Sequence, residues 1–452
     1  MIRCGLDIFR GCRGRFRYWL SARDCYDSIS LMVAIAFALG ITPFLVRRNA
    51  LGENSLEQSW YGFLNAIFRW LLLAYCYSYI NLRNESLIGY FMRNHVSQIS
   101  TRVHDVGGII AAVFTFILPL LLRKYFLKSV KNMVQVDTQL ERLRSPVNFN
   151  TVVGQVVLVI LAVVLLDTVL LTTGLVCLAK MEVYASWQLT FIFVYELLAI
   201  SITICMFCLM TRTVQRRITC LHKVLKNLAH QWDTRSLKAV NQKQRSLQCL
   251  DSFSMYTIVT KDPAEIIQES MEIHHLICEA AATANKYFTY QLLTIISIAF
   301  LIIVFDAYYV LETLLGKSKR ESKFKTVEFV TFFSCQMILY LIAIISIVEG
   351  SNRAIKKSEK TGGIVHSLLN KTKSAEVKEK LQQFSMQLMH LKINFTAAGL
   401  FNIDRTLYFT ISGALTTYLI ILLQFTSNSP NNGYGNGSSC CETFNNMTNH
   451  TL

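Results

Sequence analysis

The sequence predicts an all-α polytopic membrane protein with seven transmembrane helices, an N-terminal re-entrant or interfacial segment, a cytosolic N-terminus and an extracellular C-terminus. Three observations favour this class. Of the 452 residues, 52% are hydrophobic and only 16% are charged, whereas soluble domains carry about 25% charged residues. Several predominantly apolar stretches reach the length of a membrane-crossing helix, about 20 residues. The net charge of +16 lies mostly between those stretches, where basic residues set topology, so nucleic acid is not the expected partner.

Eight segments are apolar enough to consider as spans: 29–46, 60–80, 106–122, 151–176, 187–210, 287–312, 327–348 and 405–425. The first of them contains Pro43 and runs directly into Arg47 and Arg48, and basic residues also precede it. Both of its ends therefore resemble cytosolic sequence. We expect it to be re-entrant or interfacial within a cytosolic N-terminal region, 1–59. The other seven segments are the predicted spans.

Lysine and arginine are biased to one side of the predicted membrane. With the N-terminus inside, 35 of the 45 basic residues fall in segments 1–59, 123–150, 211–286 and 349–405, and 9 fall in the outer segments. Arg69 lies within the first span. Because cytosolic loops retain basic residues, this bias predicts an inner N-terminus and an outer C-terminus.

The C-terminal tail, 426–452, contains neither lysine nor arginine and carries three N-x-[ST] sequons, at Asn436, Asn446 and Asn449. A fourth sequon, at Asn84, lies in the first predicted outer loop. Sequons of this kind are glycosylated on the surface of secreted segments. We therefore expect an extracellular tail and glycosylation at these four positions.

The inner segments carry amphipathic helix patterns. Apolar residues recur at intervals of three or four over 213–230, which predicts a helix with one apolar face. Residues 262–286 are predicted to be a helix because Pro263 suits a first turn, with acidic residues early and Lys286 late. Segment 373–400 is also predicted to be a helix, from the stripe Leu381, Phe384, Leu388, Leu391 and Phe395. We expect these helices to pack together next to the membrane; the alternative is that they lie on the lipid surface. The polar stretch 231–261 is predicted to be a loop.

The end of the last span resembles the signature of the insect gustatory receptor family. Residues 417–425 consist of Thr-Tyr, five aliphatic residues and Gln-Phe. Residues 396–405 also resemble the family segment that precedes the last span. Residues 41–44 resemble an early Pro-Phe segment of the family. The seven spans, inner N-terminus and outer C-terminus are similar to those of the family, so the resemblance covers the whole chain.

The resemblance implies a ligand-gated, non-selective cation channel that acts as a chemosensory receptor in the plasma membrane of sensory neurons. It implies a channel domain, 60–425, with cytosolic anchor helices within 211–286 and 349–404 and a pore helix, 405–425, contributed by each of four subunits. The expected partners are a small-molecule agonist, membrane lipid, and identical or related receptor subunits, as a homotetramer or hetero-oligomer. The alternative is an inverted-topology metabotropic receptor or a small-molecule transporter, although internal repeats typical of transporters are not evident.

The candidate pore and gate residues lie on the last span: Thr417, Tyr418, Ile421, Gln424 and Phe425. Four copies of this helix around an axis could form a ring of Gln424 amides above aliphatic side chains that resist ions by dewetting. The alternative is that Gln424 and Phe425 are ordinary interfacial residues. Residues 406–425 contain no acidic side chain, which favours weak ion selectivity.

Most candidate ligand residues lie near the predicted outer ends of the other spans; Glu196 is expected deeper, with Gln336 and Tyr340 at the floor of the pocket. The candidates are Asp306, Tyr308, Tyr309, Trp187, Gln188, Glu196, Gln336 and Tyr340. Charged side chains inside spans are costly and usually face protein or water, and aromatic and hydroxyl groups suit a small polar ligand. His104 and Asp105, at the start of the second span, join this group. The alternative is that the aromatic residues form an interfacial belt.

Motifs of an enzyme are not evident in the sequence. We find no Gly-rich phosphate loop, catalytic triad or pair of acid-base carboxylates, and we expect neither enzymatic activity nor a cofactor. His274, His275 and Cys278 contain metal-ligating groups, but no fourth ligand is in register, so packing or solvent exposure is the favoured interpretation.

Overall fold

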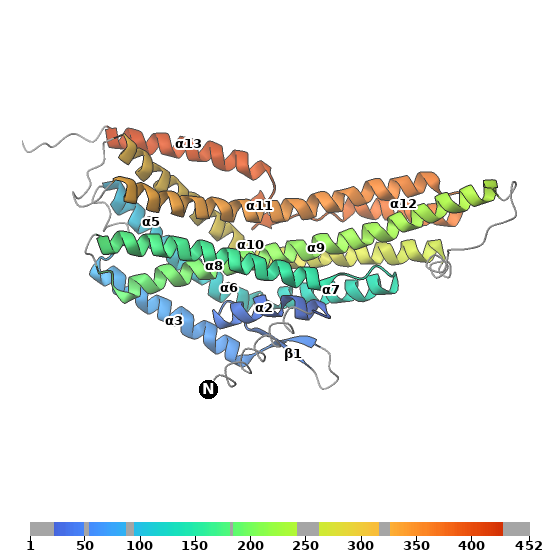
Figure 1. Ribbon diagram of the computed structural model, residues 1–452, viewed down its shortest axis with the longest axis horizontal. Helices are drawn as coiled ribbons and strands as arrows, with labels where there is room; N and C mark the ends of the chain where they lie inside the picture. The colour runs from blue at the N-terminus through green and yellow to red at the C-terminus, as the bar shows by residue number, and fades with distance from the viewer. Residues whose placement is uncertain are drawn as a thin grey trace, which may run out of the picture.

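The protein is an elongated bundle of helices (Figure 1). The computed structural model describes residues 22–48, 54–86, 95–180, 184–241, 262–315 and 326–427. The helices are α2 (Cys25–Ala38), α3 (Trp60–Arg83), α5 (His95–Ala112), the π-helix η1 (Val113–Ile117), α6 (Leu118–Leu121), α7 (Arg123–Arg142), α8 (Phe149–Lys180), α9 (Trp187–Asn241), α10 (Pro263–Leu314), α11 (Thr326–Lys371), α12 (Ala375–His390) and α13 (Thr406–Ser427). Two short antiparallel hairpins pair β1 (Phe44–Arg48) with β2 (Asn54–Gln58) and β3 (Thr396–Ala397) with β4 (Phe401–Asn402).

Seven helices in the described part of the chain are long and apolar enough to cross a membrane, which confirms the predicted fold class. They are α3, the α5–η1–α6 run, α8, α9, α10, α11 and α13. In contrast, α2 has only 14 residues, about 21 Å of helix against about 30 Å of hydrocarbon. The apolar segment at 29–46 therefore does not form a span, as expected. Its re-entrant or interfacial placement remains a prediction.

Three helices are much longer than a membrane is thick. Helices α9, α10 and α11 contain 55, 52 and 46 residues, or roughly 70–80 Å each at 1.5 Å per residue. Pro263 begins α10 in the position that tolerates a missing N–H, and the side chain of Asp262 accepts a hydrogen bond from the Ala264 N–H. Each of the three has an apolar half and a polar half. The polar halves are the C-terminal part of α9, the N-terminal part of α10 and the C-terminal part of α11, and they extend together beyond the membrane-spanning part of the bundle (Figure 1).

The polar halves pack into a bundle with a core of its own. Leu221 and Leu225 of α9, Ile277 of α10 and Leu381 and Phe384 of α12 are fully buried in one continuous core. The amphipathic helices thus bury their apolar faces against one another. This arrangement supports the expected packing over the alternative of separate helices on a lipid surface.

Helix α7 was not predicted from the sequence, because its segment was treated as a connecting loop. Phe126, Val130, Met133 and Leu140 are buried along one face of it, and their spacing is that of an amphipathic helix. The helix is also strongly polar on its other face, which masked the signal. It packs mainly along α10.

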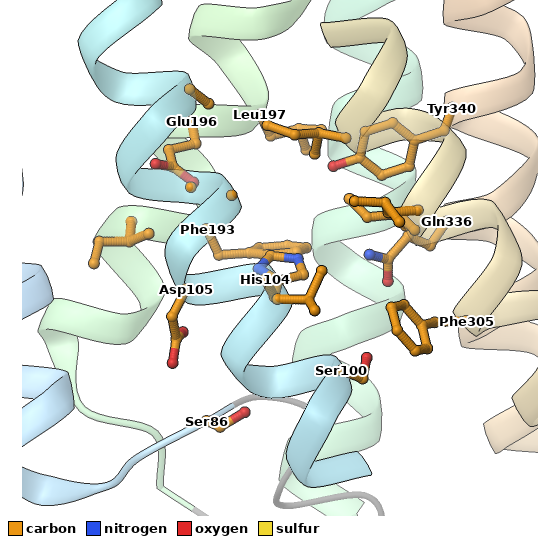
Figure 2. Close-up of a pocket in the computed structure, with 18 of the residues that line it drawn as sticks. Ser86, Ser100, His104, Asp105, Phe193, Glu196, Leu197, Phe305, Gln336 and Tyr340 are labelled. Atoms are coloured by element: carbon orange, nitrogen blue, oxygen red, sulfur yellow. The ribbon is translucent and has the colours of Figure 1, made fainter. Parts of the chain in front are cut away.

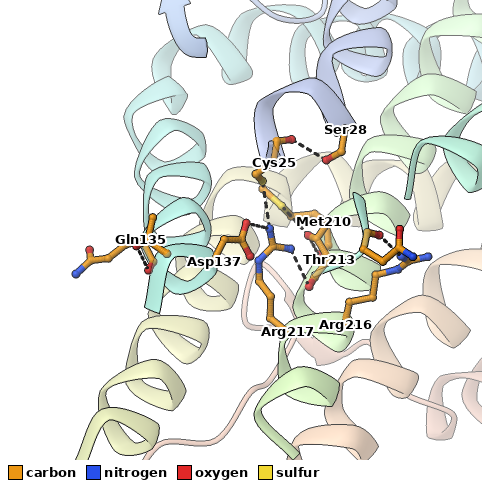
Figure 3. Close-up of polar contacts among 10 residues, drawn as sticks. Cys25, Ser28, Gln135, Asp137, Met210, Thr213, Arg216 and Arg217 are labelled. Atoms are coloured by element: carbon orange, nitrogen blue, oxygen red, sulfur yellow. Dashed lines mark hydrogen bonds and ion pairs between the residues drawn. The ribbon is translucent and has the colours of Figure 1, made fainter. Parts of the chain in front are cut away.

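A buried ion pair joins α7 to α9 and lies against the start of α2 (Figure 3). Arg217 of α9 is only 1% exposed, and its Nη2 lies 2.6 Å from Oδ2 of Asp137 on α7. The same nitrogen lies 3.2 Å from the Cys25 sulfur at the start of α2. Burial raises the pKa of the Cys25 thiol to about 11, so this group stays protonated and neutral beside the pair. The pair therefore fixes the position of the short N-terminal helix.

Two helix boundaries differ from the prediction. Helix α12 ends at His390, so the predicted helix 373–400 is wrong beyond that residue. Ile393, Phe395 and Ala397 are buried alternately, with the period of two of extended chain, and the following turn places Gly399 at φ +73°. Conversely, the predicted loop at 231–261 is helical as far as the end of α9, and its remainder lies outside the described residues.

Candidate ligand cavity and pore helix

A cavity of about 100 Å³ lies among α3, α5, α9, α10 and α11. The lining residues occupy the last turns of α3, positions 100–111 of α5, and the first turns of α9 and α11. On α10 they lie near the C-terminal end. Alternating chain directions bring these parts to one end of the bundle, which is the end that the charge bias predicts to be extracellular.

One wall of the cavity is built around a partly buried carboxylate, that of Glu196. The Tyr77 hydroxyl of α3 donates a hydrogen bond of 2.6 Å to Oε1 of Glu196 on α9. Gly108 of α5 makes room for this pair, because a Cβ at this position would lie 1.9 Å from the Tyr77 hydroxyl and 3.3 Å from Oε2 of Glu196. A side chain at 108 would therefore displace the pair.

Polar groups also face the cavity from α5 and α11. Figure 2 shows the His104 imidazole, the Gln336 amide and the Tyr340 hydroxyl directed toward the same space, with Phe193 beside them. Asp306 of α10 is nearly fully buried, and its Oδ2 has no hydrogen-bond partner among the described residues. Such a site combines aromatic surfaces with acceptors that a ligand N–H or O–H could satisfy.

The structure brings half of the candidate ligand residues together. Glu196, Asp306, Gln336 and Tyr340 line the cavity, as do His104 and Asp105. The other candidates do not line it: Trp187, Gln188, Tyr308 and Tyr309. Trp187 is 58% exposed and stacks on Tyr75, Gln188 is buried, and the two tyrosines are fully buried in a cluster of Phe329, Phe332 and Phe333.

Sequence reasoning missed three contributors to the site: Tyr77, Phe193 and Gly108. Tyr77 and Phe193 lie inside apolar spans, where a tyrosine or phenylalanine resembles any other apolar residue in the sequence. The hydroxyl of Tyr77, two turns before the end of α3, was the available signal. The role of Gly108 depends on what lies opposite it, which local sequence does not record.

Helix α13 lies along the outside of the bundle, mainly against α10 (Figure 1). Of the residues in its most apolar stretch, within Thr406–Gln424, only 6% are buried inside the chain. Its packed face carries the larger apolar side chains Leu407, Ile411, Leu415, Leu419 and Leu422. Its exposed face carries Thr410, Gly413, Thr417, Ile420, Ile421 and Gln424. The candidate pore residues Thr417, Tyr418, Ile421 and Gln424 are thus all on exposed positions, and the Phe425 side chain lies outside the described residues.

Two contacts fix α13 to the rest of the chain. At its start, Arg405 donates hydrogen bonds of 2.8 and 3.1 Å to both carboxylate oxygens of Glu349 on α11. Farther along, the Tyr418 ring lies edge-on to Phe300 of α10, with centroids 6.0 Å apart. The threonine hydroxyls bond to the backbone of the preceding turn; Thr417, for example, donates to the Gly413 carbonyl. The helix is therefore held on one side and open on the other.

Seven membrane-crossing helices, a polar cavity at one end of the bundle and a peripheral last helix define a multi-pass membrane protein with a small-molecule-sized cavity. The model of the 7tm chemosensory receptor family matches residues 29–429. The chain belongs to this family of chemosensory receptors, which confirms the resemblance drawn from its C-terminal motif.

The similar proteins cover nearly the whole chain. Gustatory receptor 28b of Drosophila melanogaster is 62% identical over 97% of this chain and 94% of its own length. Gustatory receptor 28a of the same insect is 32% identical over 92% of this chain and 98% of its own length. Among solved structures, the olfactory receptor OR5 from Machilis hrabei has a TM-score of 0.55 at 14% identity, covering 88% of this chain and 97% of that one. That likeness supports the fold.

Proposed function

We propose that this receptor is a subunit of a ligand-gated, non-selective cation channel in the plasma membrane of sensory neurons. The observation that carries the proposal is the exposed face of α13. Hydroxyl, glycine and amide positions run along a helix of membrane-crossing length, from Thr410 to Gln424. Polar residues inside a membrane usually face protein or water, so this face fits a water-filled axis shared with other subunits. Four copies would close such a pore, as the family resemblance implies.

The agonist would occupy the cavity at the outer end. The OR5 receptor has also been solved in complex with eugenol, so a protein of this fold can bind a small organic molecule. Here the carboxylates of Glu196 and Asp306 and the surrounding aromatic rings favour a small ligand with hydrogen-bond donors.

Helix α10 offers a mechanical link between the ligand and the pore. Ile298, Leu301 and Phe305 of α10 line the cavity, and Phe300 of the same helix contacts Tyr418 of α13. A ligand that shifts this part of α10 therefore acts directly on the pore helix. Rotation of α13 would replace aliphatic side chains at the constriction with Gln424 or water, relieving the dewetted barrier.

Whole-cell recording in a cell line without matched G proteins tests this proposal. We expect agonist-evoked current that persists without intracellular nucleotides. Gln424→Ala or Phe425→Ala should raise resting current or change evoked current, whereas Gln383→Ala, on an exposed face of cytosolic α12, should not. Current that requires nucleotides would favour the metabotropic alternative. Wild-type currents in both pore variants would refute the gate assignment.

A further inference from the structure

A second cavity, of about 290 Å³, lies between α8, α9 and α11 at the end of the spans opposite the ligand cavity. Its walls are aliphatic over most of their length, with Val156, Val159 and Val163 from α8 and Leu339 and Ile342 from α11. This composition suits a hydrocarbon chain rather than a hydrated polar ligand.

The polar end of this cavity is cationic. Arg212 and Arg216 of α9 and Arg353 of α11 line it together with one carboxylate, Glu349 of α11, so three positive groups face one negative group. Arg216 donates a hydrogen bond of 2.6 Å to Oε1 of Gln155. The Nε of Arg353 lies 3.6 Å from Oε2 of Glu349. Arg212 is half-buried and forms neither a hydrogen bond nor an ion pair with any residue that the structure describes. A partly buried guanidinium has lost part of its hydration, and an anion at this end of the cavity would give it a partner.

The cavity opens toward the surface of the spans. Ile342 and Ile345 line the cavity and are also 37% and 48% exposed. The neighbouring outer face of α8 presents Leu158, Leu161 and Leu165, a purely aliphatic surface that would face lipid. A molecule dissolved in the bilayer can therefore enter sideways between α8 and α11.

We propose that this cavity binds one anionic amphiphile, an acyl chain with a negatively charged head group, taken from the cytosolic leaflet. The charge bias of the chain places the arginine end at that leaflet, where basic pockets between helices bind anionic head groups. The acyl chain would lie along the aliphatic walls. Asp167 closes the far end, where it accepts a hydrogen bond from Ser201. Ser201 and Arg212 are 11 residues apart on α9, about 16 Å, so this carboxylate does not oppose the head group.

The site adjoins the base of the pore helix. Arg353 shares the Glu349 carboxylate with Arg405, immediately before α13. A head group bound to Arg353 leaves Glu349 to Arg405 alone. Occupancy of the cavity therefore bears on how firmly the first turn of α13 is held.

Native mass spectrometry of the purified full-length protein tests the proposal, with phosphatidylserine, oleate and phosphatidylcholine as probes. We expect retention of an anionic probe in preference to phosphatidylcholine. Arg212→Gln should weaken that retention about fivefold, the effect of one basic residue near an anionic lipid surface. Arg142→Gln, an exposed arginine of α7 outside the cavity, is the matched control and should leave retention unchanged.

Two further variants separate the head group from the chain. Val159→Phe fills the aliphatic part while keeping all three arginines, and should also reduce retention; Arg353→Gln replaces Arg212→Gln if the latter is not recovered intact. Preference for phosphatidylserine over oleate identifies a phospholipid, and the reverse identifies a free fatty acid. Equal retention of phosphatidylcholine, or no change in the Arg212→Gln variant, would overturn the proposal. The assay measures binding alone, so its result is independent of channel activity.

Discussion

Removal of the Asp137 carboxylate should destabilise the whole bundle, because it strands a buried charge. Arg217 is 1% exposed, and its guanidinium is held by Asp137 at 2.6 Å and by the Thr213 carbonyl at 3.1 Å. In Asp137→Ala, the guanidinium keeps its charge and loses its only acidic partner in the described part of the chain. The Cys25 thiol cannot replace the carboxylate, because burial raises its pKa to about 11.

The expected loss is large for one substitution. Breaking a buried ion pair by removing one partner costs about 3–5 kcal/mol. With an unfolding entropy of roughly 2.1 cal/mol/K per residue, that loss lowers the midpoint of a chain of this length by about 3–5 °C. An exposed pair should matter much less: Arg47 and Glu57 lie 3.8 Å apart with side chains 68% and 44% exposed, and such pairs contribute about 0–1 kcal/mol.

Thermal unfolding in detergent, followed by size-exclusion chromatography of a fluorescent fusion, measures both effects. Glu57→Ala is the control and should leave the midpoint within about 1 °C of the wild type. The double variant Asp137→Leu with Arg217→Met should recover most of the loss, because hydrophobic residues of similar volume can replace a buried pair. A midpoint for Asp137→Ala equal to that of Glu57→Ala would show that the buried-charge argument is incorrect.

Three other outcomes test the site and the topology. Gly108→Ala should weaken agonist sensitivity about fivefold or more, since its methyl group would collide with the Tyr77 hydroxyl and break the hydrogen bond to Glu196; leaving such a group unsatisfied costs about 1–3 kcal/mol. Gly154→Ala, on α8 outside this cavity and with nothing within 4 Å of its Cβ, is its control in the same dose–response assay. Asp306→Asn should shift the agonist dose response, and a wild-type curve would remove this residue from the site. Asn84→Gln should abolish one glycosidase-sensitive mass shift, because this sequon lies exposed at the end of α3; an unchanged shift would argue against glycosylation there. The sequons at Asn436, Asn446 and Asn449 lie outside the described residues and need the same test.

The proposed coupling through α10 gives the site its functional meaning. One helix carries cavity-lining residues on one face and the Phe300 contact with α13 on another. Because a packed helix moves as a rigid element, a displacement of a few tenths of an ångström at the cavity can reach the pore helix without a long chain of intermediates. Phe300→Ala should therefore separate agonist binding from opening.

Part of the site could be predicted from sequence, because ionisable groups inside apolar spans are conspicuous. Glu196 and Asp306 were found this way, and both line the cavity. Tyr308 and Tyr309 follow Asp306 directly, yet they are fully buried among phenylalanines. Consecutive residues of a helix point about 100° apart, and only packing decides which of them meets a cavity.

The sequence by itself determined the membrane class, the seven spans, the orientation expected from charge and the family, because each is recorded locally as apolar length, basic residues or a short motif. Tertiary structure alone decided which side chains share a cavity, how α7 joins the polar bundle, and which face of α13 remains open. Those features depend on residues far apart in the chain: Tyr77 and Glu196 are 119 positions apart, and Cys25 and Arg217 are 192 apart. Their proximity follows from the packing of whole helices, which no local pattern encodes.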